Sequence, residues 1–223
     1  MLHTFDGIEG SAPDGLIFDQ AGSLYGTTLF GGDCNCGIVF ELVPIGNGEW
    51  KEKILHSFTD GADGGFPAPG LLLDQAGNLY GTTEEGGSPS QCVDEAGCGV
   101  VFELTPNFGG TWTEKVLHQF TGSWDGGVPF AGLIFDQAGN LYGTAAWGGN
   151  HNYCTELSGG CGVVFKLIPN SEGTWSETVL HTFLDDPGAH PQTGVIFDAA
   201  GDIYSTTEGD NITTYGSVFE IMP

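Results

Sequence analysis

Residues 132–144 read Gly-Leu-Ile-Phe-Asp-Gln-Ala-Gly-Asn-Leu-Tyr-Gly-Thr, and the same segment recurs at 15–27, at 70–82 and, in altered form, at 194–206. Its aspartates recur with a period of about 55–62 residues, which is long for a solenoid and suits propeller blades. In the first three copies a Gly-x-Val-Phe-type run follows, and then a Trp…Leu-His-x-Phe run. The chain is therefore a repeat protein with four copies of one unit.

Each copy predicts four short strands. An apolar run and the Leu-Tyr-Gly-Thr run form a hairpin around Asp-x-x-Gly, whose glycine suits a left-handed turn position. A third strand ends at a residue such as Pro106, and a fourth, such as Trp112–Phe120, alternates with period two. The 39 glycines among 223 residues argue against helices. The sequence predicts an all-β fold, a four-bladed β-propeller of four-stranded antiparallel blades.

The two ends of the chain share one repeat. The last copy stops before its Trp…Leu-His-x-Phe run, and Leu2-His3-Thr4-Phe5 supplies the missing piece. We therefore expect an N-terminal strand 2–5 to complete the last blade and close the ring, or to be donated to a neighbouring molecule in a head-to-tail contact. The expected single domain is 1–223, with blades at about 15–58, 70–120, 132–183, and 194–222 plus 2–5. No membrane span and no signal peptide are expected, since residues 2–5 belong to a blade.

Charge limits the possible partners. The chain has four lysines, no arginine and 29 carboxylates, which give a formal net charge of −25. Nucleic acid and anionic membranes are excluded as partners, because both are bound through clustered Lys and Arg. More than half of the carboxylates fall in loops that the topology places on one face of the propeller.

Calcium is the cation that suits such loops, because it takes carboxylate and carbonyl oxygens. The candidate ligands are Asp60 and Asp63, in Asp-Gly-Ala-Asp-Gly, and Asp125 in the corresponding loop. The alternative is a solubilising acidic surface with glycine-rich turns. No other cofactor is expected.

Cysteines occur in three local pairs in the loops between second and third strands: Cys34 with Cys36, Cys92 with Cys98, and Cys154 with Cys161. Local disulfides predict an extracellular or cell-surface protein. Zinc is the competing interpretation, although the spacing matches no familiar zinc finger. The fourth copy carries Asn211-Ile212-Thr213, a glycosylation sequon, at this place.

Aromatic residues in the acidic loops suggest a sugar platform, because sugar rings stack on aromatic faces while carboxylates bind hydroxyls. The candidates are Phe66, Trp124, Trp147 and Tyr153. The alternative is that these side chains cover the ends of the hydrophobic core. Four histidines repeat with the blades, which indicates packing between blades rather than catalysis. No catalytic residue is predicted, and a carboxylate pair for glycoside hydrolysis stays a remote alternative.

The segment Gly70 to Leu104 resembles the GloVer tandem repeat of "choice-of-anchor" bacterial surface proteins, and the resemblance extends over all four copies. The fourth copy departs most, with Ala200, Asp202 and Ser205 at motif positions. The resemblance implies an exported protein without established enzymatic activity, and it supplies no catalytic residues. The sequence thus favours a non-catalytic structural or adhesive protein that self-assembles into a surface layer or filament. A glycan-binding module is the second hypothesis, and a glycoside-active enzyme is the third.

Overall fold

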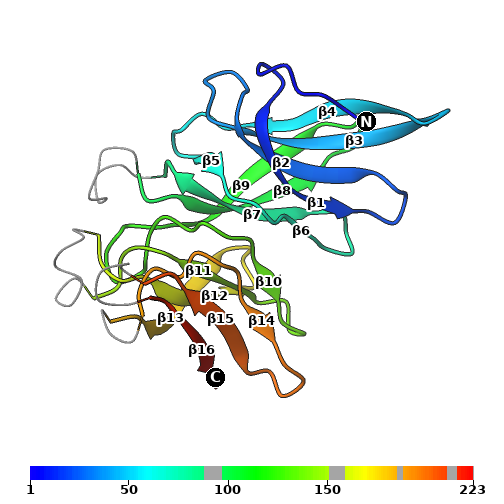
Figure 1. The fold of residues 1–223 in the computed structure, drawn as a ribbon. Coiled ribbons are helices and arrows are strands. Elements are labelled where there is room, and N and C mark those ends of the chain that lie inside the picture. The colour runs from blue at the N-terminus through cyan, green and yellow to red at the C-terminus, as the bar shows by residue number, and fades with distance from the viewer. Residues whose placement is uncertain (88–96, 151–158, 185–187, 210–214, 223) are drawn as a thin grey trace.

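A computed structural model describes residues 1–87, 97–150, 159–184, 188–209 and 215–222, and no helix occurs among them. Four antiparallel sheets follow one another along the chain (Figure 1). The first contains β1 (Ser11–Phe18), β2 (Leu24–Phe30), β3 (Ile38–Gly46) and β4 (Glu49–Ser57). The second contains β5 (Gly65–Pro67), β6 (Leu72–Leu73), β7 (Leu79–Glu85), β8 (Val100–Pro106) and β9 (Trp112–Gln119). The third contains β10 (Ile134–Phe135), β11 (Leu141–Ala145), β12 (Val163–Pro169) and β13 (Trp175–Thr182), and the fourth contains β14 (Ile196–Phe197), β15 (Ile203–Thr207) and β16 (Ser217–Ile221).

The hairpin at the start of each repeat is confirmed. In the third sheet, β10 pairs with β11 in the register Ile134↔Tyr142. The Asp136 carboxylate accepts the backbone N–H groups of Ala138 and Asn140, both at 2.9 Å, and Gly139 takes a left-handed φ of 83°. The repeated aspartate and glycine are therefore turn residues, as their spacing predicts.

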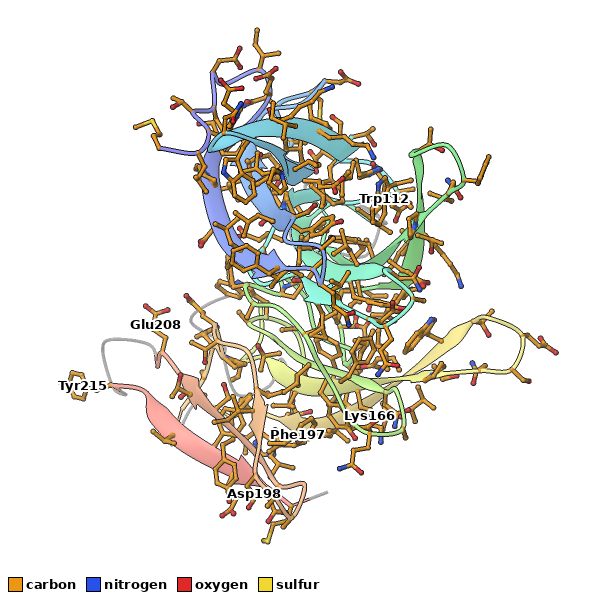
Figure 2. The ribbon with its side chains drawn as sticks, turned by 90° about the vertical axis from the view of Figure 1, so that its right-hand side faces the viewer. Trp112, Lys166, Phe197, Asp198, Glu208 and Tyr215 are labelled. Atoms are coloured by element: carbon orange, nitrogen blue, oxygen red, sulfur yellow. A yellow bond between two sulfur atoms is a disulfide. The ribbon has the colours of Figure 1, made fainter. Side chains whose placement is uncertain are left out.

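The core lies between successive sheets. One cluster of buried side chains joins β8 and β9 to β11 and β12, with Phe120 and Phe165 fully buried at a ring-centroid distance of 5.1 Å. The ring of Tyr25 in the first sheet likewise packs on the ring of Trp112 in the second, with 6.2 Å between the ring centroids (Trp112 is labelled in Figure 2). Because each sheet is apolar on both faces, neighbouring sheets stack as propeller blades do.

Glycines let the first strands of successive sheets approach one another. A Cβ atom on Gly15 would lie 2.8 Å from the backbone nitrogen of Gly70, and one on Gly132 would lie 2.1 Å from the Gly70 carbonyl oxygen. Only glycine fits such a close backbone approach. We call the side on which these first strands meet the inner side of the molecule.

The predicted ring closure is wrong for this structure. Residues 2–5 form no strand, β16 is an edge strand of a three-stranded sheet, and the two termini lie at opposite ends of the arrangement (Figure 1). The reason is that Phe5 packs on Phe40 of the first sheet, at 5.0 Å. Four sheets are therefore present without a closed ring. No helix in the described part of the chain is long and apolar enough to cross a membrane.

Candidate functional site

One residue in each repeat has a left-handed backbone conformation directly before a proline. These residues are Ala12 (φ 53°), Phe66 (φ 55°), Val128 (φ 51°) and His190 (φ 57°). The conformation is unfavourable for β-branched and bulky side chains. A hydrogen bond across the sheet junction holds it, as when the Phe66 N–H donates to the Cys36 carbonyl oxygen of the preceding sheet at 2.7 Å. The junction therefore fixes where each of these side chains points.

Aromatic pairs occupy two of these junctions on the inner side. Phe66 lies 5.9 Å from Phe30, the last residue of β2, with ring planes at 78°. The His190 ring lies 4.8 Å from the ring of Trp147, two residues beyond β11. Its Nδ1–H donates to the Ala146 carbonyl oxygen at 2.9 Å. Phe30 is 38% exposed. Aromatic surface is therefore available to a ligand on the inner side.

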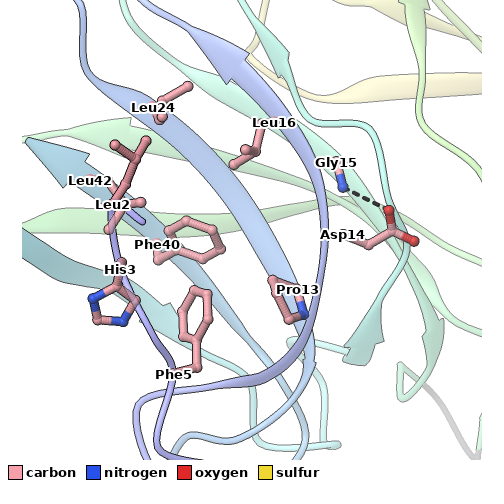
Figure 3. Close-up of a pocket in the computed structure, with 10 residues that line it drawn as sticks. All are labelled: Leu2, His3, Phe5, Pro13, Asp14, Gly15, Leu16, Leu24, Phe40 and Leu42. Atoms are coloured by element: carbon pink, nitrogen blue, oxygen red, sulfur yellow. Dashed lines mark hydrogen bonds between the residues drawn. The ribbon is translucent and has the colours of Figure 1, made fainter.

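Two carboxylates line one small cavity between the first and second sheets. Asp14 of β1 and Glu84 of β7 border a volume of about 190 Å³, together with Leu29 and Pro67. Burial, with the neighbouring Glu85 carboxylate as a second cause, raises the pKa of Glu84 to about 7. Asp14 is exposed, and its Oδ1 accepts the Gly15 N–H at 2.8 Å (Figure 3). The cavity thus pairs a carboxyl that holds a proton near neutral pH with an exposed carboxylate.

The residues at or just beyond the end of the second strand of each repeat alternate between apolar and acidic types from one sheet to the next. After each Gly-Thr-Thr-type segment come Leu29-Phe30, Glu84-Glu85, Ala146-Trp147 and Glu208-Gly209. The Glu208 carboxylate accepts a short hydrogen bond from Gln192, and Figure 2 labels Glu208. We define the inner rim as Asp14, Phe30, Phe66, Glu84, Trp147 and Glu208. Asp14 and Glu84 are among the loop carboxylates that the sequence places on the acidic face, but no motif marks them as a pair.

The predicted sugar residues divide between the inner rim and a loop. Phe66 and Trp147 belong to the rim, while Trp124 is 62% exposed in the loop between β9 and β10. The backbone of Trp147 pairs with Gly127, three residues after Trp124, so both tryptophans belong to one junction. Tyr153 lies outside the described residues.

The predicted calcium ligands do not form one group. The Asp63 carboxylate accepts the Thr59 N–H at 3.1 Å and contacts His56 at 3.2 Å. Asp125 repeats this arrangement one junction later, with Thr121 at 2.9 Å. Asp60 lies in the same turn as Asp63, whose charge adds to burial in raising the pKa of Asp60. The calcium site stays a prediction, and the histidine packs between sheets as expected.

Disulfides form as predicted where the structure describes them. Cys34 and Cys36 are joined, with a Cα–Cα distance of 5.3 Å. Cys98 and Cys161 each take part in a disulfide as well. Cys92, Cys154 and Asn211 lie outside the described residues.

Two solved structures that are similar to this chain are described as enzymes. One, from Thermus thermophilus, is provisionally described as an oxidoreductase (glucose dehydrogenase); it matches with a TM-score of 0.54 and 19% identity over 96% of this chain and 62% of its own. Zg3597 from Zobellia galactanivorans, a family 117 glycoside hydrolase, matches with a TM-score of 0.53 and 13% identity over 98% and 69%. The chain thus spans less than two thirds of the first structure. These matches correct the prediction of a non-catalytic structural or adhesive protein, because the molecules that share the fold are described as enzymes.

A search among curated proteins finds no match. A family model described as the Gloeobacter/Verrucomicrobia repeat matches residues 1–157, which include the first two copies of the repeat and the first half of the third. This agrees with the resemblance that the repeat motif carries. The chain therefore belongs to the Gloeobacter/Verrucomicrobia repeat family.

Proposed function

We propose that the chain acts on a neutral carbohydrate at the inner rim, as a glycoside-active enzyme. The observation that carries this proposal is the shared cavity of Asp14 and Glu84. Glycoside hydrolysis commonly uses two carboxyl groups, one of which keeps a proton near neutral pH because its pKa is raised. Glu84 has that property and is assigned as the proton donor, with Asp14 as the second carboxylate.

Three features support a sugar as the ligand. Phe30 and Phe66 directly adjoin in sequence Leu29 and Pro67 of the cavity wall, and their rings pack on each other at 5.9 Å. Sugar C–H faces stack on such rings. The charge of −25 without any arginine disfavours anionic sugars, so the substrate class is neutral. The similar structures are described as a glucose dehydrogenase and a glycoside hydrolase. The disulfide of Cys34 and Cys36 supports an oxidising, extracellular location for this activity.

Hydrolysis of a panel of neutral aryl glycosides and oligosaccharides tests the proposal. Glu84→Gln and Asp14→Asn are each expected to lower kcat by about 10²–10⁴-fold, the usual size of an acid–base contribution. Glu172→Gln, in the exposed turn between β12 and β13, is the matched control and keeps full activity. The rate should fall as the pH rises above 7, since Glu84 then loses its proton. Absence of hydrolysis across the panel, or full activity in Glu84→Gln, rejects the proposal.

A further inference from the structure

A histidine and two glutamates converge where the N-terminal segment meets the first sheet. His3 Nε2 lies 3.4 Å from Glu52 Oε2, on β4. His3, Glu9 and Glu52 each offer one ligand atom, and these atoms all lie within 4.8 Å of one another. This is the only such group of three among the residues that the structure describes. Figure 3 shows His3 beside Phe5, whose ring fixes the segment on the sheet.

Polar atoms in this group are buried without hydrogen bonds. The Glu52 side chain is 7% exposed, and its Oε1 atom has no hydrogen-bond partner within the described part of the chain. His3 Nε2 is buried in the same way. A buried polar atom without a partner is costly, and a buried charge is costlier. A cation bound between these side chains would give the unpartnered oxygen of Glu52 a partner.

Electrostatics point in the same direction. The buried Glu52 carboxyl lies close enough to Glu9 and Asp6 to interact with the charges of both. The lysine ion pairs found among the described residues involve Glu41 and Asp136, so neither reaches this group. Three carboxylates thus face one imidazole without a lysine to balance them.

The next sheet junction provides an internal comparison. His56, Asp63 and Glu114 occupy the corresponding places at the second junction, and Glu114 Oε1 is buried without a partner there too. However, Asp63 is held by the N–H and hydroxyl of Thr59. The first junction is the place where the N-terminal segment meets the first sheet. There Asp6 takes the place of Thr59, and the longer Glu9 takes the place of Asp63. Compared with the second junction, the first therefore has one hydrogen-bond donor fewer and one carboxylate more. Within the described residues, only the first junction brings three ligand atoms together.

We propose that His3, Glu9 and Glu52 bind a divalent transition-metal ion, with zinc as the best match. Imidazole nitrogen and carboxylate oxygen are both ligand types that zinc accepts, and three protein ligands leave a fourth tetrahedral position for water. Calcium is a poorer match, because it prefers six to eight oxygen ligands. The ion connects the N-terminal segment to β4 and neutralises the junction. This site is separate from the inner rim and from the predicted calcium ligands.

Zinc binding to the untagged chain, freed of metal by a chelator, tests the site by titration calorimetry. The chain should bind one zinc ion tightly, and zinc should raise its melting temperature by mass action. Glu9→Gln and His3→Gln should each weaken binding at least about 100-fold, since even indirect supports of a metal are worth about 10–100-fold. Glu114→Gln, a control at the position of the second junction that corresponds to Glu52, should leave both the affinity and the melting shift unchanged.

The Glu9→Gln variant separates loss of a ligand from loss of the fold. It removes a repulsive charge, so without metal it should melt at the same temperature as the parent chain or higher, with an unchanged near-ultraviolet circular dichroism spectrum. The proposal is overturned if the parent chain shows no saturable zinc binding. Equal affinity in Glu9→Gln, or an equal loss in Glu114→Gln, overturns it as well.

Discussion

The two threonines of each Gly-Thr-Thr segment have different partners. In the second sheet the Thr82 hydroxyl donates to the Ala131 carbonyl oxygen across the junction at 2.9 Å. The Thr83 hydroxyl instead donates to the Glu85 carbonyl oxygen of its own loop, also at 2.9 Å, and accepts the Val100 N–H. The first threonine therefore joins two sheets, and the second shapes the loop that leads to the inner rim.

Thr82→Val should destabilise the chain by about 1–3 kcal/mol, because it leaves the buried Ala131 carbonyl oxygen without its donor. Thr105→Val is the matched control, since Thr105 is exposed on β8 and valine suits a strand. Urea denaturation followed by tryptophan fluorescence measures both. If the two variants differ by less than about 0.5 kcal/mol, the hydroxyl bond does not hold the junction.

At the level of strands, the N-terminal segment shows what a sequence pattern can decide. A fourth strand makes two contacts: its edge pairs within its own sheet, and its Phe packs on the next sheet, as Phe58 does on Phe102 at 5.2 Å. Residues 2–5 keep the second contact, through Phe5 and Phe40, but not the first. The repeat phase predicts that residues 2–5 belong to such a strand. It cannot predict which of the two contacts forms, because that depends on how far successive sheets rotate.

Phe5→Ala should cost about 2 kcal/mol of unfolding free energy, less than the roughly 3–5 kcal/mol expected for Phe120→Ala. The order follows from burial, since Phe5 is partly exposed and Phe120 is fully buried. Equilibrium denaturation of both variants against the parent chain measures the difference. An unchanged stability in Phe5→Ala would mean that the segment does not rest on the first sheet.

At the level of the whole molecule, the repeat predicted the hairpins and the order of the four sheets. The cavity between the first two sheets was not predictable, because Asp14 and Glu84 are far apart in sequence and meet only when the sheets stack. The metal group was hidden for a related reason. In sequence, His3 looks like the other repeat histidines. Glu9, which stands where the next repeat has Asp63, becomes a possible metal ligand only because folding brings Glu52 close to it.

The chain should be most stable on the acid side of neutrality. Burial raises the pKa of four glutamates to about 7, namely Glu52, Glu84, Glu114 and Glu177. Between pH 4.5 and 7 the fold therefore holds protons that the unfolded chain releases, so the unfolding free energy falls as the pH rises. His56 and His181 act oppositely, because burial lowers the pKa of each below 6.5. Four glutamates outnumber two histidines, and the net charge of −25 adds repulsion as the carboxyls ionise.

The melting temperature should accordingly rise as the pH is lowered from 8 to about 5. Differential scanning fluorimetry with a chelator present measures this without interference from bound metal. Replacing Glu114 and Glu177 together by glutamine should flatten the profile, because the glutamine amide does not titrate in this range. A melting temperature that stays constant or increases toward pH 8 would show that these glutamates are ionised in the fold.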